Sequence, residues 1–280
     1  MKSEFILNGT LLEVSKFPGG ELNIRIPENL GYREFDMVAA LAEVYLPPTK
    51  IPELHVLEVK VRDSDGIIGC LLIKDALDRI SNSPVKLKLH YMPYSRQDRV
   101  CNSGEAFGLK VVANLINSAG FHSVETLDNH SDVATSLLDN VVNLDYNDIL
   151  TGTELLSDIG LGVLTVVAPD AGSTKKIEKF GTEFIQCLKT RNLETGSLSG
   201  FRVLNDVVDA DLVIVDDICD GGGTFIGLTK ELYNAGAHTV QLYVTHGIFS
   251  KGLAPLYEAG ITKIMSANTI YETNHNMEIV

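Results

Sequence analysis

Two adjacent aspartates and a run of three glycines stand close together in 211-DLVIVDDICDGGGTF-225. The apolar run before Asp216 and Asp217 predicts a buried strand, and the segment from Asp220 to Thr224 leads into a helical pattern. Successive backbone N–H groups of a glycine-rich loop can converge on an anion, and the following helix adds its dipole. No lysine follows the glycines, so this is not the nucleotide loop G-x-x-x-x-G-K-[ST]. The loop therefore predicts a phosphate site of another kind.

The two aspartates beside this loop need a separate role, because carboxylates repel phosphate. Adjacent carboxylates can accept hydrogen bonds from vicinal hydroxyls, or they can gather Mg²⁺ and with it a polyphosphate ligand. A sugar phosphate satisfies both parts, with its phosphate in the loop and its diol at Asp216 and Asp217. The alternative is an acidic N-cap before a helix, with the glycines in an ordinary turn. The combination of paired acids and successive glycines favours the ligand site.

Strands and helices must alternate to position these residues. Short apolar runs predict buried strands at 37–44, 54–60, 85–91, 163–168, 211–216 and 239–245. Helical periodicity predicts helices at 66–80, 105–119 and 225–235. This alternation predicts an α/β fold with largely parallel sheets flanked by helices, in which ligands bind at the carboxyl ends of the strands.

The strand and helix pattern runs twice, over 35–142 and over 163–268. We therefore expect two similar α/β domains, an N-terminal one at 1–145 and a C-terminal one at 146–280. The last strand is expected to pack on the N-terminal domain.

Composition excludes several classes of partner. With 23 basic and 37 acidic residues, the formal net charge of −14 argues against a nucleic-acid partner. The four cysteines form no C-x-x-C pair, which predicts neither a disulfide framework nor a zinc site and indicates the reducing cytoplasm. The longest apolar stretches have strand length, so we expect no signal peptide, no membrane span and no membrane partner.

The polar segment 187-CLKTRNLETGSLSGF-201 carries Lys189 and Arg191 between glycines. Two interpretations are open at this point. The segment is either a mobile loop whose cations close over phosphates, or a β-hairpin turn with solvated charges.

Several motifs together resemble those of the ribose-phosphate pyrophosphokinases, which synthesise phosphoribosyl pyrophosphate (PRPP). The opening segment is similar to the ribose-phosphate loop of type I phosphoribosyltransferases, and 92-MPYSRQDR-99 is similar to a signature of the pyrophosphokinases. Further similar segments follow in the family's order, at 17-FPGGE-21, 75-DALDR-79, 128-DNH-130, 169-PDAG-172, 189-KTR-191 and 245-THGIFS-250. The resemblance implies two phosphoribosyltransferase-like domains.

The resemblance also implies a reaction, in which the β,γ-diphosphoryl group of ATP moves to the anomeric hydroxyl of ribose 5-phosphate and AMP is released. The implied ATP-binding residues are Phe17, Glu21, Arg96, Gln97, Asp98 and Arg99. The implied ribose- and phosphate-binding residues are Asp216, Asp217, Asp220, Gly221, Gly222, Gly223 and Thr224. In the family a neighbouring subunit supplies the counterparts of Phe17 and Glu21. This implies a homo-oligomer, a dimer or a hexamer, with the ATP site near a subunit interface.

Mg²⁺ is the cofactor that the resemblance implies, with His130, Asp170 and Asp128 as its residues. An imidazole and a carboxylate can hold Mg²⁺ directly or through water, and Asp128 would orient the imidazole. The implied catalytic residues are Lys189, Arg191 and His130. The two cations would stabilise charge on the transferring diphosphoryl group.

The sequence departs from the family's pattern at two glycines. Gly19 stands where the family has an aspartate or asparagine, and Gly221 stands where it has a threonine or serine. Gly221 removes a hydroxyl donor to the 5-phosphate and is expected to open space at that end of the sugar. Three alternatives to PRPP synthesis follow. One is transfer to a 5′-extended ribose such as ADP-ribose, as in NAD metabolism. The others are a base-using phosphoribosyltransferase, which the 92–99 and 128–130 motifs oppose, and a non-catalytic regulatory homologue, which the retained Lys189 opposes.

Overall fold

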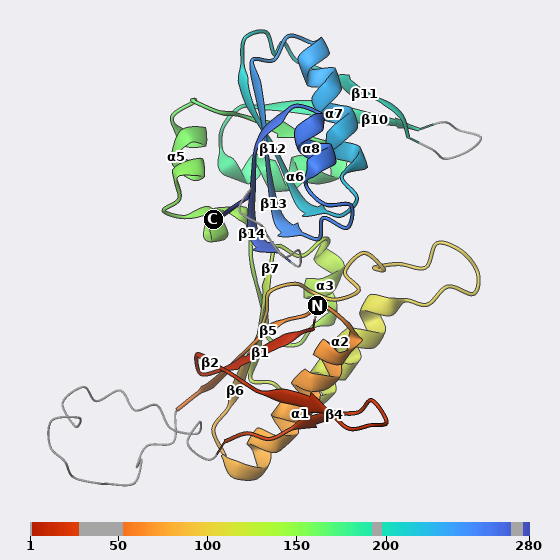
Figure 1. Cartoon of the computed structure of the whole chain (residues 1–280), viewed down its shortest axis with the longest axis vertical. Coiled ribbons are helices and arrows are strands. Elements are labelled where there is room, and N and C mark those ends of the chain that lie inside the picture. Colours follow the sequence, from red (N-terminus) through yellow and green to blue (C-terminus); the bar gives the residue numbers. More distant parts are fainter. Residues whose placement is uncertain (1, 28–52, 192–197, 270–276) are drawn as a thin grey trace, which may run out of the picture. The chain divides into compact units, whose positions relative to one another are not determined.

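The chain folds into two compact units of alternating strands and helices, Met1–Asn143 and Leu144–Val280 (Figure 1). The computed structural model describes residues 2–27, 53–191, 198–269 and 277–280. The boundary predicted between residues 145 and 146 falls beside this division. Among the helices in these described ranges, none is both long enough and apolar enough to cross a membrane.

The first unit is built on a mixed sheet. In spatial order its strands are β2 (Thr10–Leu11), β1 (Glu4–Leu7), β5 (His55–Lys60), β6 (Val85–Leu89), β7 (Ser123–Leu127) and β8 (Val141–Leu144). Strands β5, β6 and β7 run parallel, and β1 runs antiparallel to β5. The helices are α1 (Ser64–Ile80), α2 (Gly108–Ser118) and α3 (Asp132–Leu137), and β3 (Val14–Lys16) pairs with β4 (Leu22–Ile24) as a separate hairpin.

Alternation along the strands creates the core of this unit. Side chains of a strand point to opposite faces in turn, so Leu57 of β5 and Leu87 of β6 share the face that is fully buried. Ile73 and Leu77 of α1 and Leu109 of α2 complete the same apolar cluster. Each such side chain contributes about 1.5–3 kcal/mol when it leaves water.

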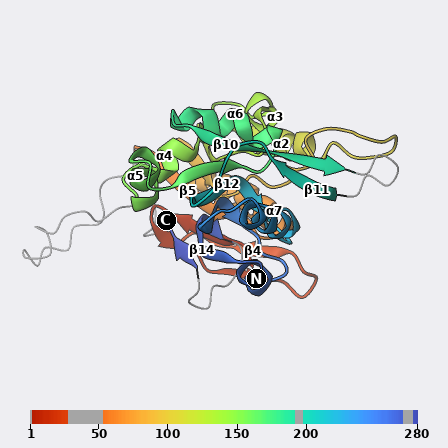
Figure 2. The same ribbon diagram turned by 90° about the horizontal axis from the view of Figure 1, so that it is seen from above.

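The second unit contains a larger sheet. In spatial order its strands are β11 (Leu198–Val203), β10 (Phe184–Arg191), β9 (Thr165–Ala168), β12 (Asp211–Cys219), β13 (Thr239–Gly247), β14 (Ile261–Thr269) and β15 (Glu278–Ile279). All neighbouring pairs are parallel except β10 and β11, which form an antiparallel pair (Figure 2). The helical segments are α4 (Tyr146–Leu150), α5 (Glu154–Gly160), α6 (Ala171–Ile177), a 3₁₀ turn (Glu178–Phe180), α7 (Gly223–Asn234) and α8 (Ala254–Glu258).

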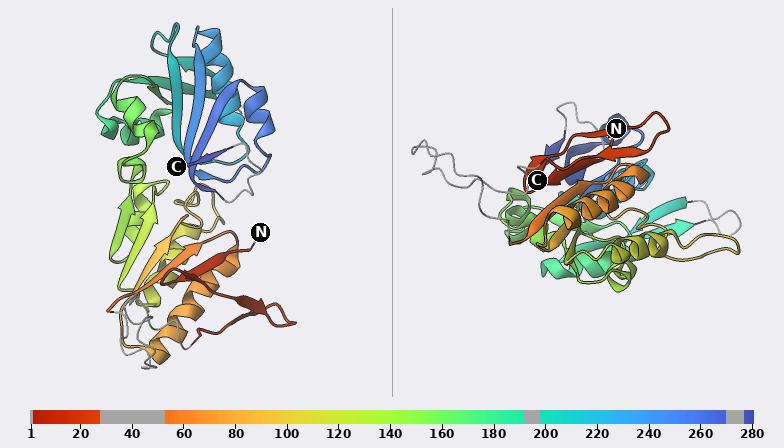
Figure 3. Two further views of the ribbon diagram at one scale, coloured as in Figure 1. Left: turned by 60° about the vertical axis from the view of Figure 1, so that its left-hand side comes forward. Right: turned by 90° about the horizontal axis from the view of Figure 1, so that it is seen from below.

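Helices cover both faces of this second sheet (Figure 3). Leu212 and Ile214 of β12 belong to the cluster that contains α7, whereas Val213 and Val215 belong to the cluster that contains α6. A strand that is buried on both faces reads as a continuous apolar run, which is why the sequence predicted this strand.

The structure confirms the α/β class and corrects several details. Strand β12 continues through the aspartate pair to Cys219, because its pairing with β13 extends to Gly247. The last strand, β15, pairs with β14 within the second sheet. The segment 187–201 provides the two arms of a hairpin, β10 and β11. The predicted strand at 37–44 lies outside the described residues.

A buried histidine joins two parts of the first unit. His55 is fully buried at the start of β5, and its Nδ1 lies 3.1 Å from the Asn8 side-chain nitrogen. Its Nε2 lies 3.1 Å from the hydroxyl of Ser81, the residue that follows α1. Burial lowers the pKa of His55, because the imidazolium would lose its hydration.

This burial predicts a loss of stability in acid. The unfolded imidazole takes up a proton near pH 6.5 that the folded one takes up only at lower pH, so the free energy of unfolding should fall as the pH drops below about 6.5. The slope is at most about 1.4 kcal/mol per pH unit for one proton. Urea unfolding between about pH 5 and pH 7.5 should show a shallower dependence for His55→Gln than for the wild type. The exposed His122→Gln is the control, and equal slopes for both variants would contradict the assignment.

Candidate active site

The predicted sugar-phosphate residues gather at the carboxyl edge of the second sheet. Parallel strands end at one edge, and β9, β10 and β12 bring Asp170, Lys189 and the pair Asp216–Asp217 there. Three carboxylates and a lysine therefore lie at one edge of the sheet, on or directly after neighbouring strands. Such a cluster is where a polar ligand of an open α/β sheet binds.

Asp170 is held in place by the start of α6. Its Oδ1 accepts hydrogen bonds from the backbone N–H groups of Gly172 (2.9 Å) and Ser173 (3.2 Å), as an N-cap does. Its Oδ2 lies 2.8 Å from Lys189 Nζ. Burial acts to raise the pKa of Asp170, but the hydrogen bond and charge of Lys189 outweigh it and hold that pKa below its usual value. Asp170 is therefore a fixed carboxylate with one oxygen turned to a cation.

Asp216 and Asp217 are adjacent carboxyl groups that are largely removed from water at this edge of the sheet. Asp217 is buried, and Asp216 accepts its backbone N–H at 3.0 Å. Burial, the neighbouring Asp217 carboxylate and the more distant Asp170 together raise the pKa of Asp216 well above its usual range. Lys176 of α6 offsets part of this charge, with its Nζ 3.7 Å from Asp217 Oδ2.

The glycine loop directly follows this edge. Gly222 has a φ of +73°, which side-chain-bearing residues rarely adopt, and a Cβ there would lie 3.0 Å from Leu256 Cδ2. Helix α7 begins at Gly223, and it has neither a side-chain cap nor an acidic residue in its first turn. Its first N–H groups are therefore directed at the loop without a competing carboxylate from the helix itself. This geometry suits a phosphate.

The space beside Gly221, which the sequence predicted to be open, is bordered by Lys251. A Cβ built on Gly221 would lie 3.5 Å from Lys251 Cε and 3.6 Å from Lys251 Cδ. The methylene stem of Lys251 thus lies across this glycine. Lys251 reaches the loop from the connection between β13 and α8.

The antiparallel arms β10 and β11 hold Lys189 at the edge. Lys189 pairs with Phe201 of β11, and a Cβ on Gly227 of α7 would lie 2.8 Å from Phe201 Cε2. Helix α7 and the arm β11 are therefore in close contact. Arg191 ends β10, and the turn at 192–197 lies outside the described residues.

In the first unit the predicted nucleotide residues follow strand β6. Gln97 accepts a backbone hydrogen bond from Leu109 of α2 at 3.2 Å, and its side chain lies against Gly108, where any Cβ would collide with it. Arg96 and Arg99 are exposed, and Asp98 Oδ1 lies 3.5 Å from Arg99 Nε. The segment is thus anchored through Gln97 at the start of α2 and presents its arginines to solvent.

The predicted metal residues of the first unit follow strand β7. Asp128 is buried with a φ of +35°, and His130 is exposed. Asn129 between them is fixed, since its N–H donates to Asn143 Oδ1 at 3.0 Å and its amide donates to Thr126 Oγ1 at 2.9 Å. Within the described ranges no three His, Cys, Asp or Glu side chains form a group that could hold a metal ion.

The β3–β4 hairpin carries the two residues predicted to reach another subunit. Phe17 is 54% exposed at the turn, and its N–H donates to the Glu21 carbonyl at 2.9 Å. A Cβ on Gly19 would lie 2.6 Å from Glu21 Oε2, so the Glu21 carboxylate folds over this glycine. An aspartate or asparagine at position 19 would displace it.

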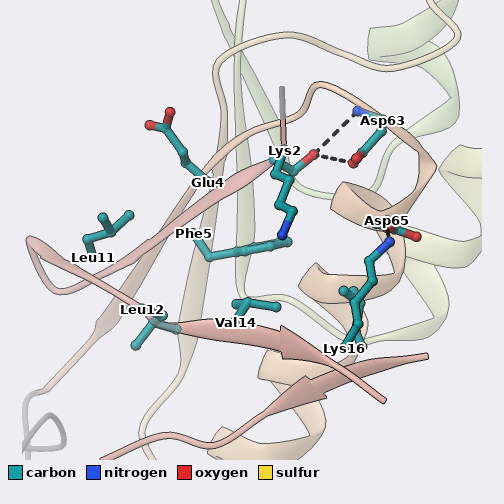
Figure 4. A pocket seen from close by; sticks show the side chains of 11 residues that line it. Lys2, Glu4, Phe5, Leu11, Leu12, Val14, Lys16, Asp63 and Asp65 are labelled. Atoms are coloured by element: carbon teal, nitrogen blue, oxygen red, sulfur yellow. Dashed lines mark hydrogen bonds and ion pairs between the residues drawn. The ribbon is translucent and has the colours of Figure 1, made fainter. Parts of the chain in front are cut away.

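A cavity of about 190 Å³ lies beside the same hairpin and the start of α1 (Figure 4). Its polar walls are already paired, because the Ser3 hydroxyl donates to Asp63 at 2.6 Å and Lys16 contacts Asp65. No residue predicted for the functional site lines this cavity.

Sequence reasoning missed the two lysines that complete the edge of the second sheet. Lys176 follows Asp170 by less than two helical turns, so the helix start at Asp170 was an available signal. Lys251 comes directly after the 245–250 motif, but nothing in the sequence indicated that it crosses the glycine loop.

Comparison with known proteins shows similarity along nearly the whole chain. A family model for the N-terminal domain of ribose phosphate pyrophosphokinase matches residues 6–120. The chain is 29% identical to the ribose-phosphate pyrophosphokinase of Sulfurisphaera tokodaii, over 98% of this chain and 90% of that one. It is 26% identical to the enzyme of the same name from Hyphomonas neptunium, over 96% and 82% of the two chains.

A solved structure supports the fold. Phosphoribosylpyrophosphate synthetase from Mycobacterium smegmatis aligns with a TM-score of 0.70 at 24% identity, covering 91% of this chain and 79% of that one. The architecture predicted from the sequence is therefore that of a known fold.

The crowded carboxylates predict a stabilising substitution. Asp216→Asn removes the repulsion but keeps the oxygen that accepts the Asp217 N–H, so the ligand-free protein should melt higher, by about 2–4 °C for each kcal/mol of repulsion removed. A raised pKa means that the wild type loses stability as rising pH ionises Asp216, so the gain should be larger at pH 8 than at pH 5. Thermal melting with the exposed Glu231→Gln as control tests this. A lower melting temperature for Asp216→Asn would contradict it.

Proposed function

We propose that this chain, a member of the ribose-phosphate pyrophosphokinase family, transfers the β,γ-diphosphoryl group of ATP to the anomeric hydroxyl of ribose 5-phosphate. The products would be PRPP and AMP. The observation that carries the proposal is the edge of the second sheet, where an aspartate pair stands next to a glycine loop and a lysine.

The acceptor has two chemically different ends that match this edge. The diol of the ribose would donate hydrogen bonds to Asp216 and Asp217. Two hydroxyl donors would be favourable there because the two carboxyl groups repel each other. The 5-phosphate would accept hydrogen bonds from the loop at Gly222 and Gly223 and interact with the N-terminus of α7. The anomeric hydroxyl would then project from the diol side toward the nucleotide.

Lys189 would act on the group that moves. In the ligand-free protein its ammonium neutralises Asp170 at 2.8 Å. When a triphosphate approaches, the same ammonium would stabilise the charge that develops on the transferring diphosphoryl group. In-line attack by the sugar hydroxyl needs no covalent enzyme intermediate, only positioning and cations.

The residues present fit Mg²⁺ as a companion of ATP. Mg²⁺ commonly takes one or two carboxylates and completes its shell with phosphates and water, so no three-residue protein cluster is required. Asp170 offers one oriented oxygen, and Asp216 and Asp217 add two carboxyl groups at the same edge of the sheet. Mg²⁺ bound there would offset the charge of the triphosphate. In the first unit, Asp128 and His130 are proposed as further residues for Mg²⁺.

The nucleotide would be bound by the first unit and by a second copy of the chain. Arg96, Gln97, Asp98 and Arg99 are proposed to contact ATP, with Gln97 positioned against α2. An exposed aromatic ring such as that of Phe17 can stack on the adenine of ATP that is bound at another subunit. Helices α1 and α2 also expose apolar residues at helical spacing, Ile68 with Leu72 and Val111 with Leu115, which favours a homo-oligomer.

AMP release with separate acceptors tests the function. With ATP and Mg²⁺, ribose 5-phosphate should support turnover and give PRPP. ADP-ribose is the second candidate acceptor, because Gly221 lacks the hydroxyl that the family places there. Turnover with ADP-ribose but not with ribose 5-phosphate would identify ADP-ribose as the acceptor. No AMP release with either acceptor would identify a non-catalytic homologue.

Removing the cation of Lys189 should affect the chemical step. Lys189→Met is expected to lower kcat about 10²–10⁴-fold with little change in KM for ribose 5-phosphate, because the charge acts on the transition state. Lys179→Met is the matched control, since Lys179 is exposed and pairs with Asp145 instead. Equal kcat values for both variants and the wild type would remove Lys189 from the mechanism.

A further inference from the structure

Lys251 lies across the first glycine of the phosphate loop. Its Cδ and Cε are within 3.6 Å and 3.5 Å of the position that a Gly221 Cβ would take, an ordinary van der Waals distance. The ammonium is one bond beyond Cε. A charged group thus reaches the loop from the connection between β13 and α8.

The backbone of that connection is firmly held. The N–H groups of Ile248 and Phe249 both donate to the Cys219 carbonyl, at 2.9 and 3.0 Å, where β12 ends. The Phe249 side chain is fully buried, and the Gly252 N–H donates to the Phe249 carbonyl at 2.8 Å. Lys251 is therefore carried on a turn fixed to the strand that leads into the loop.

The charge of Lys251 is not used by the protein in the described part of the chain. Lys189 and Lys176 each face a carboxylate of the edge, whereas no ion pair or hydrogen bond of Lys251 is found among the described residues. Its side chain is exposed beside the uncapped N-terminus of α7. The first turn of α7 holds no acidic residue, and a cation next to its N–H groups favours a bound anion.

The identity of Gly221 is explained by this lysine and not by the backbone. Unlike Gly222, Gly221 has no left-handed φ that would require glycine. A Cβ at this position would fit, in ordinary van der Waals contact with the Lys251 stem. Glycine at position 221 therefore leaves room for the methylene groups of Lys251 beside the loop.

We propose, on the basis of the function proposed above, that Lys251 binds the 5-phosphate of the acceptor in place of a hydroxyl from the loop. The acceptor class is then a ribose with a terminal phosphate monoester. A monoester dianion gains more from an added ammonium than a singly charged phosphodiester does.

The test compares Lys251→Met, which keeps the stem and removes the charge, with Lys251→Arg and the wild type. Lys251→Met should raise KM for ribose 5-phosphate about tenfold or more with kcat nearly unchanged, and Lys251→Arg should restore most of the affinity. Lys230→Met on the exposed face of α7 is the matched control and should behave as the wild type. Equilibrium dialysis with ribose 5-phosphate should show the same loss of binding without any turnover.

An exchange of the two residues provides a second test. Gly221→Thr alone should weaken binding, because its side chain displaces the Lys251 stem. Gly221→Thr combined with Lys251→Ala should recover affinity relative to Lys251→Ala, since the new hydroxyl can donate to the phosphate.

The outcomes separate this inference from the proposed function. If the wild type releases AMP and Lys251→Met binds ribose 5-phosphate as tightly as Lys230→Met does, the inference is wrong and the function stands. If the wild type binds ribose 5-phosphate through Lys251 but releases no AMP, the function is wrong and the inference stands. If the wild type binds ADP-ribose and not ribose 5-phosphate, the monoester assignment is overturned.

Discussion

The structure of the second unit depends on placing three carboxylates at one edge of a sheet without driving them apart. Asp170, Asp216 and Asp217 come from neighbouring parallel strands, and burial together with their mutual repulsion raises the pKa of Asp216. Two lysines offset part of this negative charge. Lys176 comes from the helix that Asp170 caps, and Lys189 comes from the neighbouring strand β10. The helix, the hairpin and the edge of the sheet are therefore linked because each lysine must compensate a carboxylate.

A glycine loop next to these acids is compatible with them because the charges are separated along the chain. Asp216 and Asp217 lie on the strand, whereas the N–H groups proposed to bind the anion lie beyond Cys219, where β12 has ended and α7 begins. Gly222 makes the turn between them possible with its positive φ. A ligand with hydroxyls at one end and phosphate at the other matches this polarity.

The sequence predicted what depends on local pattern and missed what depends on contacts between distant segments. Strand β12 is buried on both faces, so its apolar run was visible, but its end was placed too early because Asp216 interrupts that run. Backbone pairing with β13 continues regardless of side-chain polarity. The motif resemblance selected the aspartates, the glycines and Lys189. It could not show that Lys251 fills the space beside Gly221, because that contact joins two connections of the fold.

The pairing of Lys189 with Asp170 connects stability to the proposed chemistry. The contact keeps an otherwise flexible ammonium within the edge and lowers the pKa of the carboxylate, so both groups are charged when ligands arrive. On the proposed function, a cation brought with ATP would compete with Lys189 for Asp170 and release the ammonium toward the phosphates. The free energy of the released ion pair would then be recovered in new charge-assisted contacts. On this proposal, the same lysine would stabilise the ligand-free edge and would act on the phosphates once ligands are bound.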